Sequence, residues 1–174
     1  MSPPWSKPLD VDRLSEAEAD IDFDVPLAEL PRLRSQLASV EGEVRGRVHF
    51  GRAAGIAIAE LTMSGTARLA CQRCLGPLEI PVETTARVGL IGAEADMSRV
   101  PDDLEPMLAR EGRISVGEIV EEELLLTLPI VPLHADANAS ACVVAAAAPL
   151  VTDERDEETQ RPFEGLGELF KRDT

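Results

Sequence analysis

The stretch LTMSGTARLACQRCLGPLEIPVETTARV, residues 61–88, predicts an antiparallel β-hairpin with a Cys-Gln-Arg-Cys sequence at its tip. Apolar residues occupy odd positions from Leu61 to Cys71 and even positions from Leu78 to Val88, a period of two that is typical of strands with one buried face. Pairing Cys71 with Leu78 places both apolar sets on the same side of the sheet. The sequence therefore predicts that Cys71 faces inward at the strand end and that residues 72–77 form the turn holding Cys74.

Two further strands and a helix are predicted on the N-terminal side of this hairpin. Apolar residues alternate with polar ones over residues 44–50, and a loop at 51–55 leads into the strand that reaches Leu61. In that strand the apolar phase shifts near Ala59 and Glu60, as a β-bulge would produce.

The sequence before these strands predicts a turn at Pro26 capped by Asp24. It also predicts a helix from Pro31 to about residue 40, ended by Gly42, because proline suits a first turn and glycine a C-terminal end. The apolar face of this helix consists of Leu30, Leu33, Leu37 and Val40.

A second, acidic helix is predicted on the C-terminal side of the hairpin. Residues 92–113 are acidic and contain two prolines, which favours a surface loop. Ser115 with Glu118 three residues later forms a capping-box pattern, and Pro129 ends the helix. The buried stripe of this helix is predicted at Val116, Ile119, Val120, Leu124 and Leu128, and its solvated side at Glu121, Glu122 and Glu123.

These elements predict an α+β fold: an antiparallel, hairpin-rich sheet with an N-terminal helix, a central acidic helix and a short C-terminal helix. We expect a flexible N-terminal segment at residues 1–22 and an α+β core domain at 23–134. Residues 135–161 are alanine-rich and then acidic, which predicts a flexible linker. Residues 162–174 regain an amphipathic pattern and predict a docking segment.

Composition points to one aliphatic domain with a strong negative charge. The chain has 174 residues, of which 44% are hydrophobic and only 3% aromatic, and its net charge is −15. Residues 27–92 hold eight arginines against six glutamates, so the acidic excess lies entirely outside them. Such a chain is repelled by phosphate backbones, because nucleic-acid affinity depends on Lys and Arg. Basic proteins are the expected partners, although negative charge also serves solubility alone.

The three cysteines are candidate ligands of a zinc ion. Their odd number argues against a disulfide framework, and a Cys-x-x-Cys turn presents two thiolates at a spacing that suits tetrahedral zinc. His134 follows a proline-containing segment and lies eight residues before Cys142. We therefore expect Cys71, Cys74, His134 and Cys142 as the candidate metal set, with idle or buried thiols as the simpler alternative.

Redox chemistry is the competing interpretation of the Cys-x-x-Cys sequence. Thioredoxin-like sites place the first cysteine at a helix N-terminus, whereas a strand pattern follows Cys74 here.

The sequence contains no P-loop, GxGxxG, GxSxG or HExxH motif. It also lacks an apolar N-terminal region typical of a secretory signal and any run of about 20 apolar residues. We therefore expect a cytoplasmic protein that is not an enzyme, does not bind a membrane and has no small-molecule substrate.

Four motifs together resemble the bacterial YceD family. They are LACQRC (69–74), GEIVEEELLLTLPIVPLH (117–134), Cys142 and RPFEGLGELFK (161–171), and the resemblance extends over about residues 23–171. It implies a role in the accumulation of large-subunit ribosomal RNA and thus in large-subunit biogenesis. Many members carry a second cysteine pair near the end, which suggests a four-thiolate metal site. This chain departs from that pattern, with Cys142 and His134 in place of the pair.

The implied role leaves two ways of acting open. Direct contact with rRNA would have to use the arginine side of the β region, since the chain lacks an aromatic stacking platform. Contact through a basic ribosomal protein or assembly factor agrees better with the net charge. The candidate RNA or partner face consists of Arg45, Arg47, Arg68 and Arg87.

Overall fold

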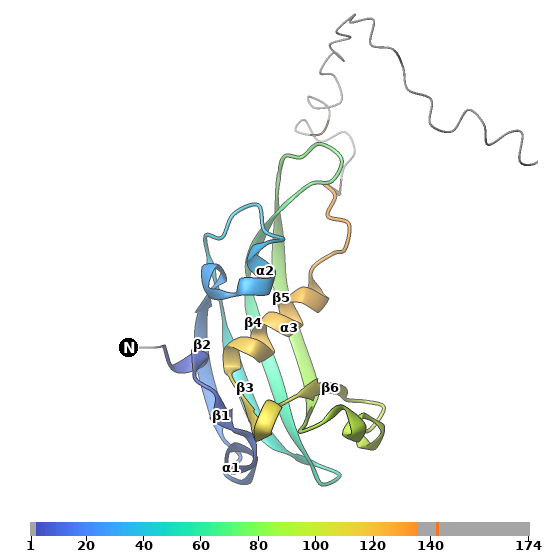
Figure 1. Cartoon of the computed structure of the whole chain (residues 1–174). Helices are drawn as coiled ribbons and strands as arrows, with labels where there is room; N and C mark the ends of the chain where they lie inside the picture. Colours follow the sequence, from blue (N-terminus) through green and yellow to red (C-terminus); the bar gives the residue numbers. More distant parts are fainter. Residues whose placement is uncertain (1–2, 136–141, 143–174) are drawn as a thin grey trace, which may run out of the picture.

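Five strands form the sheet that frames the molecule, and a helix lies across one face of it (Figure 1). This computed structural model describes residues 3–135 and Cys142, and it has the predicted α+β fold. The strand order is β2-β3-β4-β5-β6; neighbours are antiparallel except β6, which runs parallel to β5. The strands are β2 (Asp20–Pro26), β3 (Glu43–Ala53), β4 (Ile56–Ala70), β5 (Pro77–Ile91) and β6 (Glu105–Leu108).

The core lies between this sheet and helix α3 (Val116–Thr127). The predicted capping box is confirmed: the Glu118 N–H donates to the Ser115 hydroxyl at 3.2 Å, and the Ser115 N–H donates to the Glu118 carboxylate at 2.7 Å. The predicted apolar stripe of the helix is buried, and it packs on the inward side chains of the central strands, Val44, Val48, Phe50, Leu61, Met63, Val82 and Val88.

The central hairpin has the predicted faces but a different register. Leu69, rather than Cys71, is opposite Leu78. The shift is two residues, so every side chain stays on its predicted face, because side chains alternate with a period of two. The turn therefore runs over residues 71–76, and Cys71 is fully buried.

The predicted β-bulge near Ala59 is wrong. Pairing continues without interruption through Ala59, with Ile58 opposite Gly51 on one side and Gly89 on the other. Ile58 is apolar because it is buried on the second face of the sheet. A Cβ atom added to Gly89 there would lie 2.9 Å from the Val100 side chain, so the segment around Val100 covers this end. Two-sided burial, not an extra residue, explains the change of apolar phase.

The N-terminal part of the chain carries more regular structure than predicted. Asp24 does not cap a turn but lies in β2, opposite Arg45 of β3. The predicted helix of residues 31–40 is only one turn long, α2 (Pro31–Arg34), preceded by a 3₁₀ turn, η2 (Leu27–Glu29).

Within residues 1–22, for which no packed structure was predicted, Val11 is buried. The elements there are η1 (Pro4–Ser6), β1 (Leu9–Asp10) and α1 (Val11–Glu16), and β1 pairs with β7 (Arg113–Ile114).

Residues 92–113 are not the irregular loop that their composition predicted. They contain η3 (Glu94–Arg99), the edge strand β6 and η4 (Arg110–Gly112). Strand β6 is four residues long and adds to β5 through parallel pairing, which no local pattern of four residues can reveal.

Two of the three glutamates predicted on the solvated side of α3 are buried. The exposed fraction is 6% for Glu121 and 5% for Glu123. The Glu121 carboxylate accepts hydrogen bonds from the backbone N–H groups of Arg32, at 2.7 Å, and Leu33, at 3.2 Å. Helix α2 has no other side-chain cap. Glu121 of the distant helix α3 therefore supplies the hydrogen-bond acceptor that a local capping residue would normally supply.

Replacing Glu121 by alanine should cost about 1–3 kcal/mol of unfolding free energy, because two buried N–H donors lose their acceptor. Glu122→Ala is the matched control, since that carboxylate makes an exposed ion pair with Arg32 and exposed pairs contribute about 0–1 kcal/mol. Urea denaturation of both variants measures the difference. Equal losses would contradict a special role for Glu121.

Glu123 should contribute a loss of stability as its carboxyl ionises with rising pH. Burial, followed by the charges of Glu105 and Glu122, raises the pKa of this carboxyl above its usual 4.5. The folded state therefore binds the proton more tightly than the unfolded state, and ionisation above pH 4.5 is destabilising until the raised pKa is passed. We expect Glu123→Gln to be more stable than the native protein at pH 7.5 but not at pH 4. Urea denaturation at both values is the measurement. Glu83→Gln, on an exposed strand position, should show no such difference.

No helix in the described part of the chain is long and apolar enough to cross a membrane. The predicted linker and C-terminal segment lie outside the described residues, apart from residue 135 and Cys142.

Candidate metal centre

The tip of the β4–β5 hairpin is a tight six-residue turn that begins at Cys71. The Cys71 N–H donates to the Gly76 carbonyl at 2.9 Å, and the Leu75 N–H donates to the Cys71 carbonyl at 2.8 Å. Leu75 has a left-handed φ of 59°. A Cβ atom on Gly76 would lie 3.4 Å from the Cys74 sulfur, so glycine leaves room for that thiol. The turn therefore holds the Cys71 and Cys74 sulfurs within 4.8 Å of each other.

A second segment, which follows α3, is bonded to this tip. The Gln72 N–H donates to the Pro132 carbonyl at 2.9 Å, and the Gln72 side-chain amide donates to the Ile130 carbonyl at 3.4 Å. These bonds bring His134 over the turn, although it lies 60 residues from Cys74 along the chain. Gln72 was not predicted as part of this site, because its partners are backbone carbonyls, which no sequence signal reveals.

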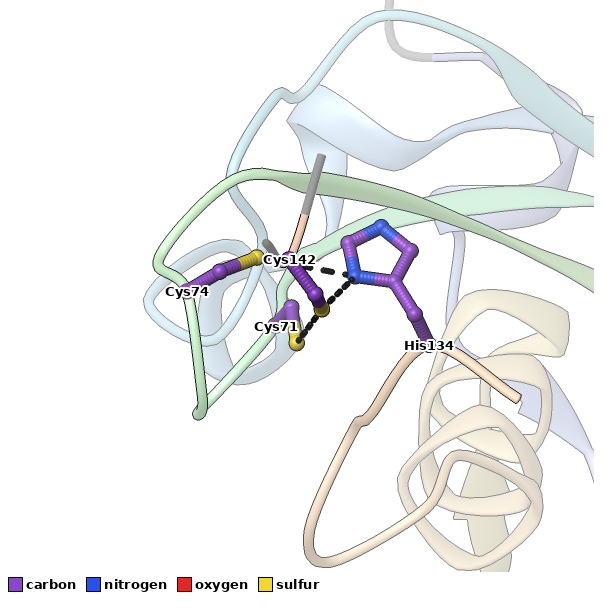
Figure 2. Close-up of side chains that lie close together, drawn as sticks. All are labelled: Cys71, Cys74, His134 and Cys142. Carbon is purple, nitrogen blue, oxygen red and sulfur yellow. Dashed lines mark hydrogen bonds between the residues drawn. The ribbon is translucent and has the colours of Figure 1, made fainter. Parts of the chain in front are cut away.

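All four predicted ligand residues meet at this point (Figure 2). The candidate ligand atoms lie within 4.8 Å of one another. The Cys71 and Cys142 sulfurs are 4.0 Å apart, and His134 Nδ1 lies 3.6 Å from the Cys74 sulfur and 3.1 Å from the Cys142 sulfur. Zinc bond lengths of about 2.3 Å to sulfur and 2.0–2.1 Å to nitrogen imply ligand separations of about 3.8 and 3.6 Å in a tetrahedron. The observed spacing fits a Cys₃His zinc site.

A hydrogen bond from His134 to a backbone carbonyl assigns the role of each ring nitrogen. Nε2 lies 3.1 Å from the Pro77 carbonyl oxygen. A carbonyl only accepts, so Nε2 carries the proton and donates. Nδ1 of the neutral ring then presents its lone pair to the three sulfurs. A metal-binding histidine commonly has its other nitrogen fixed in this way.

The surroundings of Cys71 and Cys142 shift the pKa values of their thiols in opposite directions. Burial raises the pKa of Cys71, but the backbone N–H groups of Cys74, His134 and Arg73 outweigh it and lower the pKa to about 5. Burial, with the neighbouring sulfurs of Cys74 and Cys71, raises the pKa of Cys142 to about 11. Three ionised sulfurs this close together would repel one another, so holding all three as thiolates would require a cation. A structural zinc ion would supply that charge, since zinc binds cysteine as the thiolate.

The four arginines proposed as a contact face do share the outward face of the sheet, but each is paired with a carboxylate. Arg45 pairs with Glu43, Arg47 with Asp22, Arg68 with Glu41 and Glu79, and Arg87 with Glu60 and Asp103. Opposite charges thus alternate over this surface. It is not a basic patch, although its role as a contact face stays a prediction.

A family model matches most of the chain, whereas no solved structure matches it. The family model described as "Large ribosomal RNA subunit accumulation protein YceD" matches residues 59–170. That range contains most of the β4–β5 hairpin, all of α3 and all four residues of the cluster. Because the match covers well over half of the 174 residues, the chain belongs to the YceD family.

Proposed function

We propose that this protein supports accumulation of large-subunit ribosomal RNA as a non-enzymatic cytoplasmic factor acting through basic protein partners. The observation that carries the proposal is the family match over residues 59–170. The net charge of −15 and the paired state of the sheet arginines favour a basic protein over bare RNA as the direct partner, because RNA binding requires an excess of positive charge.

In this proposal a zinc ion in the Cys₃His cluster has a structural role. It would join the hairpin tip to the segment after α3, and with four protein ligands it would leave no position open for a substrate. The alternative, a thiol oxidoreductase using Cys71 and Cys74, requires both thiols to be free of metal. Turnover of the purified protein in an insulin-reduction assay would favour that alternative, and thiols blocked by metal would disfavour it.

Depletion of the protein in its native host tests the role. We expect the ratio of large- to small-subunit rRNA to fall and to recover when the native gene is restored. An unchanged ratio would contradict the proposal.

The mode of action needs a separate test with purified components. Large-subunit rRNA fragments should bind only weakly at physiological salt, and cross-linking in cells should capture basic ribosomal proteins or assembly factors. Tight binding of rRNA fragments without a protein partner would instead establish direct RNA contact, with losses on Arg47 or Arg68 replacement.

A further inference from the structure

A groove beside α3 contains the one α3 glutamate whose buried carboxylate oxygen lacks a hydrogen-bond partner. The groove is lined by α3, by β6 and by the start of α2, with a volume of about 590 Å³. Among the described residues, Glu123 Oε1 is buried and has no hydrogen-bond partner, while the side chain as a whole is 5% exposed. A buried carboxylate without a partner is costly, so this position is set up to receive a donor.

The other glutamates of α3 that line the groove are already engaged. Glu118 belongs to the capping box, Glu121 accepts from the α2 backbone, and Glu122 pairs with Arg32. Their contacts hold α2 and α3 in place. Glu123 makes no such structural contact, so neither capping nor inter-element bonding explains its burial.

The charge and shape of the groove select a cation with an apolar stem. Five carboxylates line it, against the two guanidinium groups of Arg32 and Arg110. Apolar side chains lie among them, including Met97, 48% exposed, and Leu126, 61% exposed. A lysine side chain matches both features, because its aliphatic stem can cover apolar surface while its ammonium reaches a carboxylate.

A metal ion does not fit this site. Within the described residues, the only group of three or more metal-binding side chains with converging ligand atoms is the cysteine cluster. No three carboxylates of the groove therefore converge as the ligands of a protein metal site would. A nucleic acid is excluded by charge, since the groove would repel phosphates.

We propose that the groove between α3 and β6 binds a lysine-rich polypeptide segment of a partner protein, with one ammonium group contacting Glu123. This inference rests on the proposed function, for which it names the partner surface. Helix α3 lies on one face of the sheet (Figure 1), and the groove is lined by its side chains. The four arginines lie on the opposite face of the sheet, so the two surfaces can be tested independently.

Fluorescence anisotropy with a labelled ten-residue peptide of alternating lysine and leucine tests this site at 150 mM salt. We expect Glu123→Gln to weaken binding at least tenfold. Glu83→Gln removes the same charge from the opposite face and should change affinity by less than twofold. Because Glu123→Gln should be the more stable protein at neutral pH, unfolding cannot account for its loss.

A second variant tests the entrance of the groove without touching Glu123. Leu126→Lys adds a positive charge at an exposed position and should also weaken binding at least tenfold, whereas Leu126→Gln should have a much smaller effect. Equal losses in Glu123→Gln and Glu83→Gln would show attraction by net charge alone and would overturn the proposal. Spermidine binding as tightly as the peptide, with the same dependence on Glu123, would also overturn it in favour of a small polyamine.

Failure of this inference can be told apart from failure of the proposed function. If native protein restores the rRNA ratio in depleted cells and Glu123→Gln restores it equally while the peptide binds neither, the groove proposal is wrong and the function stands. If depletion leaves the ratio unchanged but the peptide binds with the expected dependence on Glu123, the groove stands and the function is wrong.

Discussion

Protein purified without chelator is expected to contain one zinc ion per chain, and loss of the ion should lower the unfolding midpoint by about 10 °C. The ligand atoms already have near-tetrahedral spacing, so binding requires little rearrangement. A ligand present at several hundred times its dissociation constant adds about 3 kcal/mol to stability. For a chain of this size that amount corresponds to roughly 10 °C. Metal analysis and thermal unfolding with and without chelator are the measurements.

Cys74→Ser should lose both the zinc and the added stability. Arg73→Ser is the matched control, because Arg73 is exposed in the same turn and the Cys71 sulfur is affected by its backbone N–H rather than its side chain. We expect Arg73→Ser to keep the metal. Absence of zinc from the native protein, together with three thiols that react freely with a thiol reagent, would show the cluster to be metal-free.

Gly46→Ala is expected to be among the most destabilising single substitutions in this protein, with a loss of more than about 3 kcal/mol. Gly46 lies in β3, paired with Phe23 of β2 and Met63 of β4, and a side chain at this position would face the core. An added Cβ would lie 2.0 Å from the Thr62 carbonyl oxygen, 2.8 Å from the Met63 Cα and 2.9 Å from the Phe23 ring. The nearest two atoms are backbone, so relief requires the paired strands to separate.

Gly51→Ala in the same strand is the matched control. Its Cβ would meet no atom closer than 3.6 Å, and we expect a change below about 1 kcal/mol. Urea denaturation gives both values. Similar stabilities of the two variants would show that close strand packing at Gly46 does not limit this fold.

The sequence predicted which residues lie together at the candidate site, and their binding of a metal stays a prediction. With only three cysteines and two histidines in the chain, the Cys-x-x-Cys turn left few choices for the remaining ligands, and the structure brings the four chosen residues together. Which ring nitrogen of His134 faces the three sulfurs was not predictable. It depends on the contact between His134 Nε2 and the Pro77 carbonyl, which exists only after the hairpin tip and the segment following α3 have met.

Local chemistry explains which parts of the fold the sequence determined by itself. The faces of the β4–β5 hairpin follow from alternation, which a two-residue register shift preserves, and α3 follows from a capping box and a helical apolar stripe that lie within one segment. Tertiary structure alone decided the hairpin register, the pairing of β2 and β6, and the burial of Glu121 and Glu123. Each of these depends on atoms from distant parts of the chain. The N–H groups at the start of α2 need the Glu121 carboxylate of α3 as an acceptor, and no pattern within either helix records that requirement.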